Sequence, residues 1–146
     1  RTEHARPAQC YHSAGNHEHD QVSPIRANSG GVSAGTLYSP QSASSDGTIL
    51  AVADTANNRV LLWDGVPDPR EGAGRGADHV LAQPDFGSNG ENRWTSVQRD
   101  TLCWPYGLSM RGDTLAVADS GNNRVMVWSS DERLREEQKA AMSACA

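Results

Sequence analysis

Two stretches of the chain share one order of apolar and polar positions. Residues 50–53 and 115–118 are apolar at every position, which favours strands that are covered on both faces. Each run ends at an aspartate and is followed by an Asn-rich segment of the kind that forms tight turns. Residues 59–63 and 124–128 come next, and their β-branched and aromatic side chains predict the returning strand of a hairpin.

The two hairpins belong to an internal repeat. Residues 36–63 align without a gap on residues 101–128, at an offset of 101 − 36 = 65 positions. Fifteen of the 28 aligned positions are identical, and both copies contain the core LAVADxxNNRV. A match of this length indicates a duplicated supersecondary unit.

Further strands complete each unit. Residues 41–45 and 106–110 predict a first strand, and residues 78–83 predict a fourth strand after the first hairpin. Four antiparallel strands joined by turns are typical of a β-propeller blade. We therefore predict an all-β fold made of four-stranded antiparallel blades.

The repeat also divides the chain into segments. These are a weakly patterned N-terminal segment (1–35), a first blade with a long loop that leads to the next blade (36–100), a second, partial blade (101–128) and a C-terminal helix or tail (129–146). The loop over residues 87–100 is polar and Gly-rich, and Trp94 is its expected anchor.

Composition excludes several kinds of partner. Among 146 residues, 13 are Lys or Arg and 18 are Asp or Glu, and the net charge of −5 argues against nucleic-acid binding and against attraction to a membrane surface. No apolar run is long enough to insert into a membrane. Three cysteines without CxxC spacing predict neither a disulfide framework nor a cysteine-based zinc site, and the compartment stays open.

The repeated segments LAVADTANNRVLLW and LAVADSGNNRVMVW resemble the NHL repeat of β-propeller proteins. The segment GADHVLAQPDFGSN, followed by TLCWPYGL, is similar to the long-repeat bacterial NHL proteins, although Ala82 stands where those usually have glycine. The resemblance implies a ring of about six blades in the usual case. Since this chain holds about two repeats, we expect an incomplete ring. Three explanations stay open: the chain is a fragment, several copies assemble one ring, or the two blades form an open pair of sheets.

The repeated charged residues allow two interpretations. Arg59 and Arg124 could bind a partner at the rim of the ring, together with Asp54 and Asp119. Alternatively, each aspartate accepts turn amide protons and each arginine clamps it, with Asn58 and Asn123 completing the turns. We favour the structural role, because it is repeated wherever the blade is repeated.

Positions that differ between the two copies are better guides to function than the repeated residues. Cys103, Trp104 and Tyr106 stand where the first copy has Tyr38, Ser39 and Gln41. The loop between the blades adds Arg93 and Trp94, which are residue types that protein interfaces favour. For Trp104 and Tyr106, core packing is the alternative that we favour. The candidate binding residues are Arg59, Arg93, Trp94, Trp104, Tyr106 and Arg124.

No known catalytic motif occurs in the chain, and we predict no catalytic residues and no cofactor. The residues Cys10, His12, His17 and His19 have metal-ligand chemistry, and His-x-His spacing could hold zinc or copper. Adventitious binding by a polar segment is the favoured alternative, and we predict no metal site.

The sequence therefore predicts a noncatalytic NHL-repeat propeller segment that provides a protein-binding or scaffold surface. Because the outermost blades lack a neighbour, we expect Leu50, Val52, Val125 and Val127 to be exposed, and these open blade faces permit self-association. The alternative is a part of a metal-dependent propeller enzyme of the lyase or lactonase kind, because the NHL resemblance extends to such enzymes.

Overall fold

The computed structural model describes residues 26–27, 30–68 and 75–129. The predicted C-terminal helix and the candidate metal ligands Cys10, His12, His17 and His19 lie outside the described residues. Within the described part of the chain, no helix has the length and hydropathy needed to cross a membrane.

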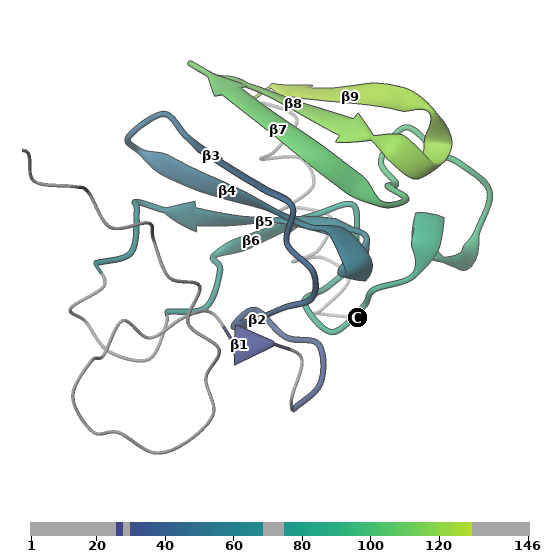
Figure 1. Ribbon diagram of the computed structural model, residues 1–146, viewed down its shortest axis with the longest axis horizontal. Helices are drawn as coiled ribbons and strands as arrows, with labels where there is room; N and C mark the ends of the chain where they lie inside the picture. The colour runs from purple at the N-terminus through teal and green to yellow at the C-terminus, as the bar shows by residue number, and fades with distance from the viewer. Residues whose placement is uncertain (1–25, 28–29, 69–74, 130–146) are drawn as a thin grey trace, which may run out of the picture.

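The strands form three sheets in chain order (Figure 1). A small parallel pair joins β1 (Arg26–Ala27) to β2 (Thr36–Leu37). The first antiparallel sheet consists of β3 (Ser42–Ser45), β4 (Ile49–Asp54), β5 (Arg59–Asp64) and β6 (His79–Leu81). The second consists of β7 (Pro105–Arg111), β8 (Thr114–Asp119) and β9 (Arg124–Ser129). These antiparallel sheets of four and three strands confirm the predicted all-β fold class, and the described residues do not close a ring.

The sequence repeat is a structural repeat. A 3-10 turn, η1 (Thr55–Asn57) or η4 (Ser120–Asn122), joins the two long strands of each hairpin. Asn58 and Asn123 follow these turns with left-handed φ angles of 52° and 53°, which asparagine tolerates better than most residues. The predicted hairpins at 50–63 and 115–128 are therefore confirmed, with equivalent residues opposite each other in both.

A buried carboxylate organises the first hairpin. Asp54 ends β4 and is completely buried. Its Oδ1 accepts the backbone N–H of Tyr38 at 2.7 Å, and its Oδ2 accepts the side-chain amide of Asn57 at 2.8 Å. The same Oδ2 accepts Nε–H of Arg59 at 2.6 Å. This carboxylate therefore joins the strand, the turn and the segment that precedes β3.

The guanidinium of Arg59 extends these connections and is itself completely buried. Its Nη2 donates to the carbonyl oxygens of Ser33 and Thr36, each at 2.9 Å. Its Nη1 donates to the carbonyl oxygen of Phe86 at 2.6 Å. Arg59 thus connects the hairpin to the chain before β3 and to the chain after β6.

The second blade repeats the carboxylate cluster. Asp119 Oδ1 accepts the N–H of Cys103 at 2.7 Å, and Oδ2 accepts from Asn122 at 2.8 Å and from Arg124 Nε at 2.7 Å. These partners lie 65 positions after those of Asp54, so the repeat preserves every contact of the carboxylate.

Arg124 repeats only part of the Arg59 network. Its Nη2 donates to the carbonyl oxygens of Gln98 and Thr101, each at 2.7 Å. Within the described residues, no carbonyl takes the place that Phe86 has in the first blade. The side chain of Arg124 is consequently 26% exposed, whereas that of Arg59 is 0% exposed.

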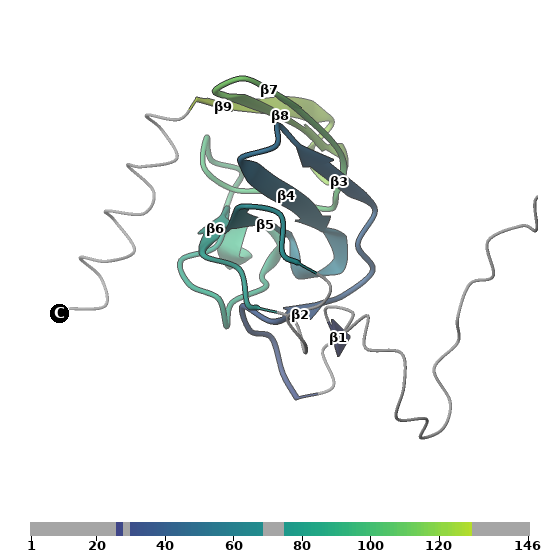
Figure 2. The same cartoon turned by 90° about the vertical axis from the view of Figure 1, so that its left-hand side faces the viewer.

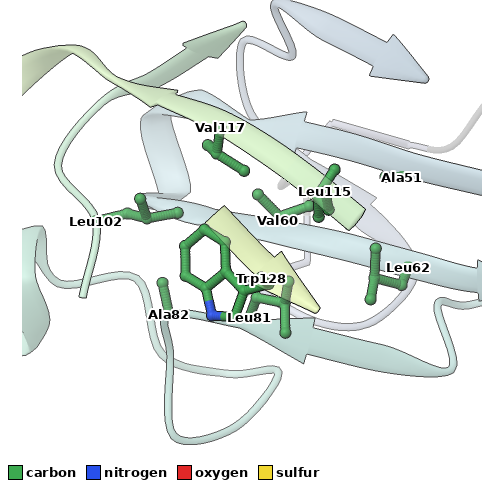
Figure 3. Packing of buried hydrophobic residues seen from close by; sticks show 9 residues of the cluster. All are labelled: Ala51, Val60, Leu62, Leu81, Ala82, Leu102, Leu115, Val117 and Trp128. Atoms are coloured by element: carbon green, nitrogen blue, oxygen red, sulfur yellow. The ribbon is translucent and has the colours of Figure 1, made fainter. Parts of the chain in front are cut away.

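The second antiparallel sheet lies over one face of the first (Figures 1 and 2). The buried apolar side chains between them form one cluster (Figure 3): Ala51, Val60, Leu62, Leu81, Ala82, Leu102, Leu115, Val117 and Trp128. Two hydroxyls of β3 also join the sheets, because Ser42 and Ser44 accept the backbone N–H groups of Leu108 and Met110, each at 3.1 Å. Apolar burial and satisfied edge amides therefore hold the two blades together.

The far face of the first sheet has its own cover. Val52, Leu61 and Trp63 pack there against Leu37 and Ala77. The indole N–H of Trp63 donates to the carbonyl oxygen of Arg75 at 2.9 Å. The first blade is thus covered on both faces, as its continuous apolar runs predict, and the expected exposure of Val52 is wrong.

The second blade is covered on one face only, and the expected exposure of Val125 and Val127 is confirmed. Val125 and Val127 of β9 are 66% and 58% exposed, although their repeat counterparts Val60 and Leu62 are buried against the neighbouring sheet. We name the exposed surface of Val125 and Val127 the open blade face.

The two aspartate variants are expected to differ in their effect on stability. Asp54→Ala should lower the free energy of unfolding by about 3–5 kcal/mol, because it leaves the buried guanidinium of Arg59 without its carboxylate. Asp119→Ala should lower it by about 1–3 kcal/mol, since Arg124 reaches water. Denaturant titration of both variants measures the difference, and equal losses would contradict the role assigned to burial.

Candidate functional site

Exposed aromatic side chains surround the turn of the first blade. Tyr38 and Trp104 are 58% and 44% exposed. The carbonyl oxygen of Tyr38 accepts the N–H of Ala56 at 3.1 Å, and the N–H of Trp104 donates to Oδ1 of Asn58 at 2.9 Å. Backbone hydrogen bonds thus hold both aromatic residues beside the η1 turn, although 66 positions separate them (104 − 38).

Tyr106 lies at the same turn. The hydroxyl of Thr55 donates to the carbonyl oxygen of Pro105 at 2.5 Å, which places the start of β7 against the first blade. Pro105 is buried, whereas Tyr106 is 43% exposed. Core packing of Trp104 and Tyr106, the alternative considered from the sequence, is therefore wrong, and only the proline between them is buried.

A second tryptophan and a carboxylate lie next to Trp104. The indole N–H of Trp104 donates to Oε1 of Glu91 at 3.0 Å. Glu91 begins η3 (Glu91–Trp94), and the indole of Trp94, which is 79% exposed, lies over Gly90. A Cβ at Gly90 would come within 2.5 Å of Trp94 Nε1, so this contact requires glycine. We name the surface of Tyr38, Glu91, Trp94, Trp104 and Tyr106 the aromatic rim.

The backbone that presents Trp94 is strained. Asn92, Arg93 and Trp94 have φ angles of 49°, 58° and 58°, and each left-handed residue other than glycine costs about 1–2 kcal/mol. Consecutive residues adopt this conformation only where surrounding contacts fix it.

Asn92 and Arg93 provide those contacts. The N–H of Asn92 donates to the carbonyl oxygen of Leu102 at 2.9 Å, and its side-chain amide pairs with that of Asn122. Arg93 donates through Nη1 to Asp100 at 3.0 Å and through Nε to the carbonyl oxygen of Ala82. The prediction that Trp94 anchors this loop is wrong, since polar side chains hold it and Trp94 points outward.

A buried glutamine ties the loop to the first blade. Gln83 Nε2 donates to the carbonyl oxygens of Asn58 and Gly90, at 3.0 Å and 2.8 Å. Asn58 Nδ2 donates in turn to the carbonyl oxygen of Asn89 at 3.0 Å. Asn58, predicted as a turn residue, therefore also holds the aromatic rim in place.

Glu91 gives the aromatic rim a negative charge. Within the described residues it forms no ion pair, whereas Arg93 pairs with Asp100. This charge also affects the thiol of Cys103. Burial raises the pKa of that thiol, and the negative charges of Glu91 and Asp119 raise the pKa further.

The predicted binding residues thus have different environments. Trp94, Trp104 and Tyr106 lie together on the aromatic rim. Arg59 is buried, Arg93 is half-buried and bonded to its own loop, and Arg124 pairs with Asp119.

Two members of the rim are not among the predicted binding residues. The departure of Cys103 from Tyr38 marks this position in the repeat, but it does not show that Tyr38 is the copy that lies on the surface. Glu91 has no signal in the pattern of the chain.

The chemistry of the rim is that of a contact surface. Aromatic faces stack, and one carboxylate accepts hydrogen bonds. In the ranges that the structure describes, no three His, Cys, Asp or Glu side chains are grouped so that they could hold a metal ion.

Comparison with known proteins adds no family assignment, because no protein-family model and no curated protein matches the chain. The NHL relationship therefore stays a prediction from the repeated residues.

The raised pKa of Cys103 predicts slow thiol chemistry. With Cys10 and Cys145 changed to serine, Cys103 should react with a disulfide reagent at pH 8 more slowly than an unperturbed thiol, because less of it is thiolate. Because the pKa is raised, the rate should still increase at pH values above the ordinary range of a cysteine pKa. Glu91→Gln should speed the reaction at pH 8, since it removes one negative charge. A rate at pH 8 equal to that of a free cysteine peptide would contradict this prediction.

Proposed function

We propose that this chain is a noncatalytic propeller segment of the NHL type and that it serves as a protein-binding or scaffold surface. The observation that carries the proposal is the aromatic rim, where four exposed aromatic side chains surround one turn. Tryptophan and tyrosine are enriched among the residues that dominate binding energy in protein interfaces.

The internal repeat indicates that Trp104 and Tyr106 have a role in binding rather than in folding. Ser39 occupies the position of Trp104 in the first blade and has nearly the same backbone, with a φ of 52° against 54°. Gln41 occupies the position of Tyr106. Because one blade folds without these aromatic residues, their presence in the other calls for a different explanation, which an interface provides.

The fixed backbone of the rim favours tight binding. Side chains that are ordered only on association lower affinity, because a partner has to supply the free energy of ordering. Around Trp94, the hydrogen bonds of Asn92 and Arg93 already fix the loop.

The repeat also supplies the test. The double variant Trp104→Ser and Tyr106→Gln introduces the residues of the first blade, so its free energy of unfolding is expected to change by no more than about 1 kcal/mol. Quantitative affinity capture from cells of the source organism should show a defined set of proteins that bind the parent and are reduced at least tenfold with the variant. Val97→Ser, a change at an exposed position outside the rim, is the control. Identical capture by parent and double variant would contradict the proposal.

We also propose that the open blade face mediates self-association. Val125 and Val127 occupy the positions that bury Val60 and Leu62 against a neighbouring sheet in the first blade. An apolar surface at positions that a neighbouring sheet covers in the other blade favours contact with a second copy of the chain.

Sedimentation at micromolar concentration tests the self-association. The parent chain should form a discrete oligomer, and the double variant Val125→Thr and Val127→Thr should shift it to monomer, because threonine keeps the strand propensity and lowers the apolar area. A parent chain that is monomeric under these conditions would overturn the proposal.

A further inference from the structure

The charge of the aromatic rim suggests the chemistry of its partner. We propose that Glu91, Trp94 and Trp104 together bind an arginine side chain of the partner protein. This inference rests on the proposed function, because it names the group that a rim-bound protein would present.

The carboxylate of Glu91 has acceptor capacity left for a partner. Its Oε1 accepts the indole N–H of Trp104, while an ionised carboxylate offers about four acceptor positions. The side chain is exposed and, within the described residues, has no cationic partner. A partner that covered this carboxylate with apolar groups would bury an unpaired charge, and an acidic partner would be repelled.

The two indoles favour a cation at the same place. Trp104 contacts Glu91 directly, and Trp94 lies over Gly90, the residue that precedes Glu91. Tryptophan is the best of the aromatic residues for attracting a cation over its ring face. With Trp94 79% exposed and Trp104 44% exposed, ring surface remains open in both.

Arginine fits this combination better than other side chains. Its planar guanidinium stacks on aromatic rings and donates hydrogen bonds to a carboxylate in the same orientation. Among the described residues, the ion pairs of the nearby arginines go elsewhere, since Arg93 donates to Asp100 and Arg59 to Asp54.

Glu91→Gln separates this proposal from a structural role of Glu91. Glutamine keeps a side-chain oxygen that can accept the indole N–H of Trp104, and it removes the charge. Asp113→Asn is the matched control, because it removes one charge at the turn between β7 and β8, at the opposite end of β7 from the rim.

The probes are two twelve-residue peptides of glycine and serine, one with three arginines and one with glutamine at the same positions. Tryptophan fluorescence reports binding at the rim, because Trp63 and Trp128 are buried while Trp94 and Trp104 are exposed. The arginine peptide should bind the parent at least tenfold more tightly than the glutamine peptide. Glu91→Gln should weaken arginine-peptide binding about tenfold, with the unfolding midpoint unchanged, whereas Asp113→Asn should change it less than twofold.

Three results would overturn the inference: equal binding of both peptides, binding of neither peptide, or equal losses in Glu91→Gln and Asp113→Asn. The outcome is distinguishable from a failure of the proposed function. If Glu91→Gln leaves protein capture intact while Trp104→Ser with Tyr106→Gln abolishes it, the rim binds proteins without a cation. If the arginine peptide binds but capture never depends on the rim, the proposed function fails and the cation site stands.

Discussion

The carboxylate of Asp54 is buried at the end of a strand, and a buried charge is stable only when hydrogen bonds and an opposite charge surround it. Its oxygens meet that requirement with donors from Tyr38, Asn57 and Arg59. Each donor belongs to a different local structure: the segment before β3, the turn and the next strand. One electrostatic requirement therefore fixes the path of the chain at this end of the blade, including the place from which Tyr38 points outward.

The second blade shows how far a repeated sequence determines a repeated structure. Asp119 keeps all the contacts of Asp54, because every partner lies within the repeated segment. Among the described residues, Arg124 keeps only part of the contacts of Arg59, because one partner of Arg59 lies in the chain after β6. The difference in burial between two identical residues thus arises from distant chain and not from their neighbours in sequence.

The blade fold does not fix which side chains stand at the positions of the aromatic rim. The left-handed position holds Ser39 in the first blade and Trp104 in the second, and both fit because the backbone hydrogen bonds there do not involve the side chain. The loop that carries Glu91 and Trp94 is held by Asn92, Arg93 and Gln83. Polar residues inside the loop supply its rigidity, and the outward side chains are consequently available for contact with a partner.

Local pattern was sufficient for the blades themselves. The apolar runs, the Asn-rich turns and the 65-residue offset predict the two hairpins and their aspartates and arginines, because strand and turn formation depends on neighbouring residues. Exposure was different: the sequence predicts exposed blade faces at Val52 and at Val125, and only the packing decides that Val52 is buried whereas Val125 is exposed. Likewise, the sequence alone predicts that Trp94 anchors its loop and that Trp104 packs in the core, but both side chains are exposed. Their exposure depends on contacts between distant segments, such as the hydrogen bond between Trp104 and Asn58, which lie 46 positions apart. The sequence by itself determined the two hairpins and their repetition, and the tertiary structure decided which side chains meet solvent, because burial is a property of what packs against a residue.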